Sequence, residues 1–369
     1  MSQFVRALGM MSGTSMDGID LAVIETDGKA VVRAGATAFR PYKEVERTAI
    51  RAALADARHV ATRSDRTDAM REAEELVTSA HVEIVRDFQT RFRDNVLPLD
   101  VIGFHGQTVF HDPSRHLTIQ LGDADRLARE TGFPVVTDLR IADVEAGGEG
   151  APLVPVYHRA MAQSADLDLP LAIVNIGGVA NITWIGPEES DLVAFDTGPG
   201  NALIDDCVHR RTGADMDRGG VLAAKGVVNE DLVASWLTNP YFERVPPKSL
   251  DRDAFTCGGA DELTLEDSCA TLTAFTAASI AKGISQLKEG ARQIVVVGGG
   301  AHNPVLLSML ENRCCVPVRT GGAIGWDPDF VEAQAFAYLA VRSMKGLPIT
   351  FPGTTGVPVP LTAGRFARP

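Results

Sequence analysis

The residues best suited to catalysis or ligand binding lie in short turns that follow apolar strands. In the segment FDTGPGN (195–201), Asp196 ends an apolar run and directly precedes a constrained turn. A carboxylate held there, and partly removed from water by the strand, is well placed as a general base. The competing interpretation makes Asp196 the N-cap of the next helix, but Asn201 stands nearer to that helix and fits the cap better. We therefore predict that Asp196 is catalytic.

A second turn, SGTSMDGID (12–20), combines small residues, hydroxyl groups and two carboxylates between apolar strands. Glycine and Ser or Thr let backbone N–H groups and hydroxyls approach phosphate oxygens closely. Asp17 or Asp20 would then hold Mg²⁺, directly or through water. An ordinary hairpin with a polar tip is the alternative, which this turn alone does not exclude. The predicted contacts of ATP in this turn are Gly13, Thr14, Ser15, Met16, Asp17, Gly18, Ile19 and Asp20.

Two more glycine-rich turns extend this pattern. The turn in NIGGVAN (175–181) allows close backbone approach from a second side, and VVVGGGAHN (295–303) ends a buried strand at a helix start, where adenosine or phosphate could rest. The glycines of 298–300 would also suit a tight strand-to-helix turn without a ligand. The candidate contacts are Gly177, Gly178, Asn181, Gly298, Gly299 and Gly300.

Other polar groups suit sugar hydroxyls or an N-acetyl group. HGQT (105–108) follows a predicted strand, although a single His after an apolar strand is more often structural. The stretch 138–155 carries carboxylates, Arg140 and a GGEG turn, and would either bind sugar or cross between domains. The candidates for sugar binding from these segments and from the turn of Asp196 are His105, Gln107, Thr108, Gly148, Thr197, Gly198 and Asn201.

The elements that must position these turns follow a repeated order. A strand–turn–strand–strand unit at 5–39 recurs at 171–196, about 165 positions later, which indicates that each unit heads its own domain. Helices are predicted within 42–95 and at 201–211, 230–237, 267–287 and 330–344, with strands at 100–105, 134–138 and 293–297 and an irregular tail after 346. The pattern predicts an α/β chain of two domains facing a cleft, residues 1–135 plus 330–369 and residues 136–329.

Composition narrows the class of function. The 369 residues carry a net charge of -13, with no basic stripe, which argues against nucleic acid or an anionic membrane as partner. No stretch approaches the ~18 apolar residues of a membrane span, and five cysteines without CxxC spacing suit buried thiols, so we expect a cytoplasmic protein. GxxxxGK[ST], HExxH and GxSxG motifs are absent, which excludes a P-loop, this type of zinc site and a nucleophile elbow.

Taken together and in this order, eight segments resemble the anhydro-N-acetylmuramic acid kinases. They are SGTSMDGID (12–20), FHGQT (104–108), ADVEAGGEGAPLVP (142–155), NIGGVANIT (175–183), FDTGPGNALID (195–205), PPKS (246–249), VVGGGAHNP (296–304) and DPDFVEAQAFAYLA (327–340). The resemblance implies an actin-like ATPase fold, with two RNase H-like domains flanking a central cleft. It assigns the catalytic base to Asp196, the ATP turn to Gly13–Asp20 and a late-helix acid to Glu332, which we add to the sugar-binding candidates.

The same resemblance implies an activity. The family uses ATP and Mg²⁺ to open the 1,6-anhydro ring of 1,6-anhydro-N-acetylmuramic acid and phosphorylate O6, which gives N-acetylmuramic acid 6-phosphate and ADP in cell-wall sugar recycling. A homodimer is expected by analogy only. This chain departs from the family pattern at Glu149, where GGQG is usual, and at 250–253, where PPKS is usually followed by TGRE, so sugar specificity is less firmly implied than the chemistry. The alternatives are a kinase for an ordinary hexose or amino sugar and a non-catalytic sensor that closes on nucleotide and sugar.

Overall fold

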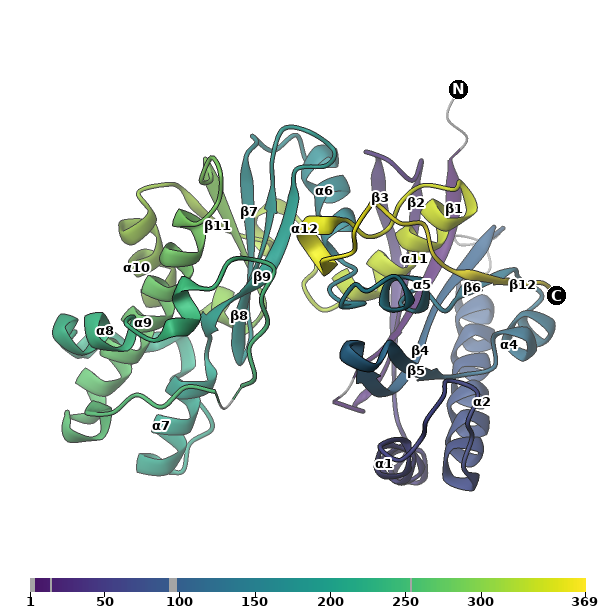
Figure 1. Ribbon diagram of the computed structural model, residues 1–369, viewed down its shortest axis with the longest axis horizontal. Helices are drawn as coiled ribbons and strands as arrows, with labels where there is room; N and C mark the ends of the chain where they lie inside the picture. Colours follow the sequence, from purple (N-terminus) through teal and green to yellow (C-terminus); the bar gives the residue numbers. More distant parts are fainter. Residues whose placement is uncertain (1–3, 14, 93–97, 253) are drawn as a thin grey trace. The chain divides into compact units, whose positions relative to one another are not determined.

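The computed structural model describes residues 4–13, 15–92, 98–252 and 254–369 (Figure 1). The predicted ATP contact Thr14 lies outside the described residues. By its internal contacts the chain divides into two compact units, Met1–Asp166 with Phe330–Pro369 (unit 1) and Leu167–Asp329 (unit 2). The prediction of an α/β chain with two domains is confirmed, and each unit is described by itself.

Unit 1 is built on a mixed sheet in the order β12-β6-β4-β1-β2-β3, with β5 paired to the far half of β4. The first three strands form an antiparallel meander, while β4 and β6 run parallel to β1. The strands are β1 (Val5–Ser12), β2 (Gly18–Thr26), β3 (Val32–Pro41), β4 (Val101–Asp112), β5 (Leu117–Leu121), β6 (Val135–Thr137) and β12 (Arg365–Ala367).

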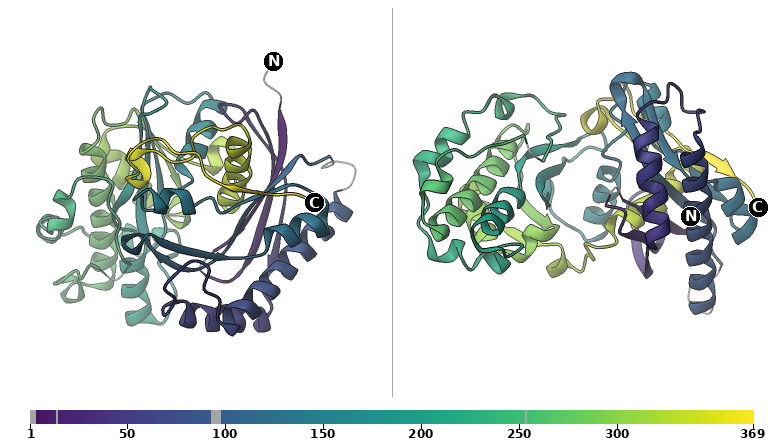
Figure 2. Two further views of the ribbon diagram at one scale, coloured as in Figure 1. Left: turned by 45° about the vertical axis from the view of Figure 1, so that its right-hand side comes forward. Right: turned by 90° about the horizontal axis from the view of Figure 1, so that it is seen from below.

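Helices cover both faces of this sheet. On one face α1 and α2 lie side by side, as the right-hand view of Figure 2 shows, and α4 packs against α2. On the other face α11 crosses β1, β2 and β4. The helices of unit 1 are α1 (Glu44–Ala57), α2 (Asp68–Arg91), α4 (Ala124–Thr131), α5 (Ile141–Glu145), α6 (Pro155–Ser164), α11 (Val331–Met344) and α12 (Pro352–Thr355).

Unit 2 has a five-stranded sheet in the order β11-β10-β7-β8-β9. Its strands are β7 (Leu171–Ile176), β8 (Val179–Ile185), β9 (Leu192–Pro199), β10 (Gln293–Val297) and β11 (Val318–Thr320). Its α-helices are α7 (Ala202–Thr212), α8 (Glu230–Trp236), α9 (Leu265–Ser285) and α10 (Pro304–Cys314). Short 3₁₀ turns at Arg218–Gly220, Pro240–Glu243 and Gly299–His302 join them near the residues discussed below.

The two units share one topology. In each, an antiparallel meander (β1-β2-β3 or β7-β8-β9) is followed by strands that run parallel to its first member (β4 and β6, or β10 and β11). The carboxyl ends of β1, β4 and β6 therefore lie at one edge of the first sheet, and those of β7, β10 and β11 at one edge of the second. This repeat confirms the two strand–turn–strand units predicted from sequence.

Several predicted element bounds are wrong in detail. The helices predicted within 42–95 are α1 and α2, whereas the expected strand 100–105 continues to Asp112 because its far half pairs with β5. The tail after 346 contains α12 and the edge strand β12. The cysteines are unpaired, but Cys315 is exposed rather than buried.

The boundary expected after residue 135 also differs from the observed division, which assigns 136–166 to unit 1. Local contacts give the reason. β6 pairs with β12, and the hydroxyl of Tyr157 in α6 donates to Gln334 of α11 at 2.8 Å. The buried carboxylate of Asp143 accepts a hydrogen bond from Thr355 at 2.7 Å. These contacts bind 136–166 to the C-terminal segment of the same unit.

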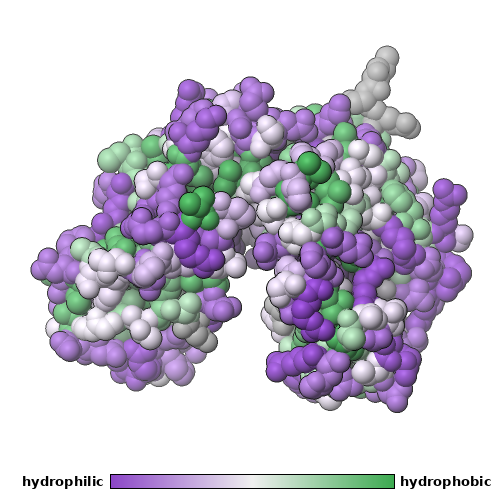
Figure 3. All heavy atoms as spheres, in the orientation of Figure 1, coloured by the Kyte–Doolittle hydropathy of each residue, from purple (hydrophilic) through white to green (hydrophobic). Residues whose placement is uncertain are grey.

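Hydrophilic residues cover much of the face of each unit seen in Figure 3, with hydrophobic residues between them. Among the described residues, no helix combines the length and apolar character that crossing a bilayer requires.

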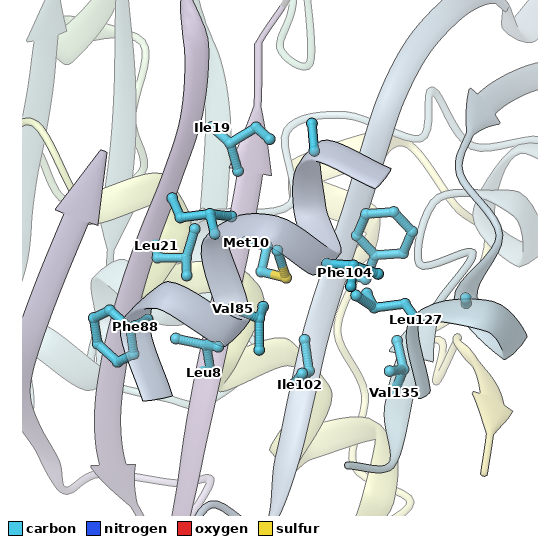
Figure 4. Packing of buried hydrophobic residues seen from close by; sticks show 14 of the residues in the cluster. Leu8, Met10, Ile19, Leu21, Val85, Phe88, Ile102, Phe104, Leu127 and Val135 are labelled. Atoms are coloured by element: carbon cyan, nitrogen blue, oxygen red, sulfur yellow. The ribbon is translucent and has the colours of Figure 1, made fainter. Parts of the chain in front are cut away.

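The core of unit 1 depends on alternation along its strands. Leu8 and Met10 of β1 and Ile19 and Leu21 of β2 point toward α2, as Figure 4 shows. The intervening residues face α11, which approaches so closely that glycine is required. A Cβ on Gly103 of β4 would lie 2.0 Å from the carbonyl oxygen of Phe336.

We predict that Gly103→Ala destabilises unit 1, since α11 must shift to accommodate the added methyl group. Overpacking of this kind typically costs about 1–3 kcal/mol. Urea denaturation should show a lower midpoint than the wild type. Gly322→Ala is the control, because no atom lies within 4 Å of its added Cβ and its φ is not in the left-handed range. Equal midpoints for the two variants would contradict the predicted close contact.

Candidate functional site

The glycine-rich turns predicted from sequence follow the first strand of each meander and the parallel neighbour of β7. The turn 13–17 follows β1, 177–178 follows β7 and 298–300 follows β10. In α/β sheets, ligands bind outside the carboxyl ends of the parallel strands. Both units therefore present their turns at the edge where ligand binding is expected.

Asp196 lies on β9, the edge strand of the second sheet, and is held by a neighbouring loop. Its backbone N–H donates to the carbonyl of Lys248 at 2.9 Å, and its carboxylate Oδ2 accepts from the N–H of Leu250 at 2.8 Å. The hydroxyl of Tyr241 donates to the Asp196 carbonyl at 2.5 Å. Asp196 is not a helix cap, because its carboxylate bonds to the 246–250 segment rather than to α7.

Burial raises the pKa of Asp196 to about 6, and the Leu250 N–H opposes this rise by stabilising the ionised form. A carboxyl group with such a pKa is ionised at neutral pH yet basic enough to accept a proton, as a general base requires.

Asp196 also belongs to a row of polar residues that crosses the sheet. Asn175 of β7 pairs with Asn181 of β8, and Asn181 pairs with Asp196 of β9. Their neighbours Val174, Ile182 and Phe195 point to the opposite face, into the hydrophobic core. The polar row therefore lies on the face of the sheet that is turned away from this core.

The turn Gly177–Gly178 is tied to the start of α7. The N–H of Asn201 donates to the Gly177 carbonyl at 2.7 Å, and the N–H of Gly200 donates to the Gly178 carbonyl at 2.9 Å. The side chain of Asn201 donates to the Ile176 carbonyl at 3.1 Å and makes no cap bond. Asn201 therefore occupies the predicted N-cap position of α7, but its side chain does not make the capping bond. Its side chain fixes the end of β7 instead.

The turn Gly298–Gly300 packs on the same strand end. A Cβ on Gly298 would lie 2.3 Å from the Asn175 side-chain oxygen, and one on Gly300 would lie 2.5 Å from Ile176. Gly299 lies near the Asn201 amide, with 3.3 Å between its constructed Cβ and Nδ2. The structure thus brings together Gly177, Gly178, Asn201 and the three glycines within unit 2.

Thr197 and Gly198, predicted to bind sugar, serve the fold of unit 2. The buried hydroxyl of Thr197 donates to the Ala180 carbonyl at 3.1 Å. A Cβ on Gly198 would lie 2.8 Å from Ser279 of α9, and its φ of 155° also disfavours other residues. These contacts of Thr197 and Gly198 are all within the protein and do not indicate a ligand.

In unit 1 the turn after β1 is supported by Gln107. The Gln107 side-chain oxygen accepts from the Ser12 hydroxyl, and its amide donates to the Gly13 carbonyl at 3.0 Å. Gln107 is fully buried. Both ends of its amide thus support the turn after β1, and the predicted contact of Gln107 with sugar stays a prediction.

Some residues of the 12–20 turn are exposed at the edge of the sheet, and others are buried in the core. Ser15 and Asp17 are exposed, and the Ser15 hydroxyl donates to Asp17 Oδ1 at 2.7 Å. Met16 adopts a left-handed conformation with φ of 57°. Ile19 points into the core, and Gly18 lies where a Cβ would be 2.4 Å from the Arg40 carbonyl. The side chain of Ile19 is therefore part of the core, and the N–H of Gly18 donates to Asp17 Oδ1 at 3.0 Å.

Asp17 and Asp20 offer oxygen ligands that suit Mg²⁺. Asp17 lies on the exposed turn, and Asp20 lies on β2 opposite Met11. Among the described residues no group of three potential metal-ligating side chains is found. A sparse set of one or two carboxylates still fits Mg²⁺, which usually keeps several waters and binds substrate phosphates.

The predicted sugar residues His105 and Glu332 meet around Arg140. Arg140 Nε donates to His105 Nε2 at 3.2 Å, and Nη1 donates to the Gly150 carbonyl at 2.8 Å. Burial and the Arg140 charge lower the pKa of His105 to about 3, so its ring is neutral. Desolvation by surrounding protein atoms raises the pKa of Glu332, and Arg140 opposes this rise. His105 lies within β4 rather than after a strand.

Arg140 was predicted only as part of the stretch 138–155, which would either bind sugar or cross between domains, and not as a sugar-binding residue by itself. The signal was available, since Arg140 is the one basic residue in the stretch 138–155. It follows β6, which places it at the same sheet edge as the turn after β1. The arrangement can offer a cation, a neutral imidazole and a carboxylate to a polar ligand.

Gly148 and Thr108 lie near this group but have local partners. A Cβ on Gly148 would lie 2.2 Å from the carboxylate of Asp143, which also accepts from the Gly150 N–H at 2.7 Å. Gly148 is therefore a packing position. The Thr108 hydroxyl accepts from Gln120 at 3.3 Å, and Gln120 lines a cavity of about 370 Å³ together with Asp138 and Ile141.

We predict that Asp196→Asn gains stability relative to the wild type as pH rises from about 4 to about 6. The folded pKa of Asp196 lies above its ordinary value of 3.8, so the folded state favours the protonated form and ionisation weakens it. Asparagine cannot ionise, and the difference should reach on the order of 1 kcal/mol above pH 6. Urea denaturation at several pH values measures it. A difference that does not vary with pH would contradict the raised pKa.

Weak structural likenesses exist among solved proteins. A ROK family glucokinase from Streptomyces griseus, in complex with glucose and AMPPNP, has a TM-score of 0.40 at 14% identity and covers 90% of this chain and 98% of that chain. Component A of the (R)-2-hydroxyglutaryl-CoA dehydratase of Acidaminococcus fermentans has a TM-score of 0.43 at 12% identity, with coverage of 92% and 99%.

Sequence relatives are much closer. The anhydro-N-acetylmuramic acid kinase of Rhodopseudomonas palustris (strain BisB18) is 51% identical over 364 residues, which cover 98% of this chain and 100% of that protein. The enzyme of the same name from Nitrobacter winogradskyi is 50% identical over 364 residues, with 98% and 99% coverage. The family model described as Anhydro-N-acetylmuramic acid kinase matches residues 5–367. The chain belongs to the anhydro-N-acetylmuramic acid kinase family.

Proposed function

We propose that this protein is an ATP-dependent kinase of 1,6-anhydro-N-acetylmuramic acid. It opens the 1,6-anhydro ring with water and phosphorylates O6, and its products are N-acetylmuramic acid 6-phosphate and ADP. Family membership supports the substrate. The observation that carries the chemistry is Asp196, a partly buried carboxylate with a pKa raised to about 6, in the unit that also holds the turns 177–178 and 298–300.

The reaction couples two bond changes. Asp196 takes a proton from a water molecule, whose oxygen attacks C1 of the sugar. The bond between C1 and O6 breaks, and O6 attacks the γ-phosphorus of ATP, which releases ADP. The proton on Asp196 then passes to solvent, so atoms and charges balance.

One carboxylate is sufficient for this scheme. Glycoside hydrolases generally need a second carboxylic acid that protonates the departing oxygen. Here O6 forms a new bond to phosphorus, which removes the need for that proton. A single base at Asp196 therefore matches the chemistry of the anhydro sugar better than that of an ordinary glycoside.

Phosphoryl transfer depends mainly on positioning and on stabilising charge. The turn after β1, supported by Gln107, and the turn 177–178 present backbone groups suited to phosphate oxygens. Asp17 and Asp20 would hold Mg²⁺, which when bound neutralises phosphate charge. His105, Arg140 and Glu332 supply donors and acceptors for the sugar.

We predict that Asp196→Asn lowers turnover of the anhydro sugar by about 10²-fold or more, since the water loses its base. Nucleotide affinity should stay close to that of the wild type. ADP release is measured in a coupled assay with the anhydro sugar, its ring-opened form and glucose. Wild-type activity with the anhydro sugar alone is the expected pattern.

The matched control is Asp261→Asn, which removes another aspartate of unit 2 from an exposed ion pair with Arg210. Exposed pairs contribute little, so its turnover should stay within about 2-fold of the wild type. Near-normal turnover by Asp196→Asn would remove Asp196 from the proposed role. Preference for glucose or the ring-opened sugar would instead indicate an ordinary sugar kinase. If no sugar led to ADP release, the non-catalytic sensor would be the better interpretation.

A further inference from the structure

The loop that holds Asp196 has its own anchor, a nearly buried lysine. Lys248 is 7% exposed, and its ammonium group donates to Gln286 Oε1 at 3.0 Å and to the Tyr241 carbonyl at 3.3 Å. The ammonium nitrogen also lies 4.9 Å from the ring centroid of Tyr241 and 5.6 Å from that of Phe195. A desolvated cation between two aromatic rings and two oxygens is firmly held.

This anchor fixes a segment that covers an exposed strand edge. β9 pairs with β8 on one side only, so its other edge needs partners. Residues 246–250 supply them at one point, since the Lys248 carbonyl accepts from the Asp196 N–H and the Leu250 N–H donates to Asp196 Oδ2. Both contacts with Asp196 therefore come from the segment that the Lys248 side chain ties down.

Tyr241 closes the arrangement from the other direction. Its carbonyl accepts from Lys248 Nζ, and its hydroxyl donates to the Asp196 carbonyl. Gln286, at the end of α9, joins the same group through its amide, which donates to the Phe242 carbonyl at 2.6 Å. The position of the Asp196 backbone is thus set by contacts that converge on one ammonium group.

We infer that Lys248 is a positioning residue for Asp196, and that it acts by holding the 246–250 segment so that the Leu250 N–H keeps one carboxylate oxygen oriented and ionised. The inference rests on the proposed function for its kinetic readout. Burial raises the pKa of the Asp196 carboxyl and the Leu250 hydrogen bond lowers it, so the proposed route from Lys248 to Asp196 runs through the 246–250 segment.

The test compares Lys248→Met with Lys282→Met. Lys282 is a matched control because it contacts the same region, with its ammonium group 2.6 Å from Glu243 and 5.9 Å from the ring centroid of Phe242, but it does not bind the 246–250 segment. The charged groups around Lys248 are Arg244, Glu243 and Lys282. The control variant changes Lys282 alone.

For Lys248→Met we expect kcat for the anhydro sugar to fall about 10-fold or more, with KM for ATP changed by less than about 3-fold. Without the Leu250 hydrogen bond the Asp196 carboxyl is harder to ionise. The acid limb of the pH profile, where kcat falls as Asp196 is protonated, should therefore move to higher pH by about half a unit or more. Lys282→Met should keep the wild-type kcat and acid limb. A folded Lys248→Met protein with both values unchanged would overturn the inference.

A milder variant and a direct titration distinguish the positioning role of Lys248 from a purely structural one. Gln286→Met removes one of the two oxygen acceptors of Lys248 but keeps the lysine, and it should shift the acid limb in the same direction by less. If Lys248→Met does not fold, an unchanged acid limb of the kcat profile in Gln286→Met overturns the inference.

If the wild type does not turn over the anhydro sugar, the proposed function fails. Carboxyl ¹³C NMR of Asp196 in the wild type and Gln286→Met still tests the positioning role, and equal titration curves would refute it.

Discussion

In unit 2 the carboxylate of Asp196 is largely buried, and it accepts a hydrogen bond from a loop outside the sheet. Burial disfavours the charge of Asp196, and a single backbone N–H, that of Leu250, offsets part of this cost. This N–H comes from the 246–250 segment, which lies along the free edge of β9. The Lys248 side chain and Tyr241 hold that segment and the Asp196 backbone in place.

The repeated topology explains where the glycine-rich turns lie. Each unit starts with a meander whose first strand has parallel neighbours, so the turn after that strand reaches the edge where ligands bind. Glycine is needed there for packing as well as for ligand approach. Gly298 and Gly300 leave no room for a Cβ against β7, which lets two turns from distant parts of the sequence lie together.

Sequence patterns predicted the fold class, the paired meanders and the turn residues, because these depend on local periodicity and on glycine. They did not predict roles that depend on distant partners. Gln107 was assigned to sugar, and its amide supports the turn at Ser12 and Gly13, 95 and 94 positions away. Asn201 is the N-cap residue of α7 as predicted, yet its side chain bonds to the Ile176 carbonyl instead of capping the helix. Arg140 and Lys248 were not singled out as site residues because their partners His105 and Gln286 are 35 and 38 positions away.

In the proposed reaction, water activated by Asp196 attacks C1 while O6 receives the phosphoryl group. Reaction in ¹⁸O-labelled water, followed by mass spectrometry of the sugar phosphate, distinguishes this route from separate hydrolysis of ATP. Label on C1 with none in the phosphate ester is the predicted result. Label in the phosphate group, or unlabelled C1 in newly formed product before anomeric exchange, would contradict the account.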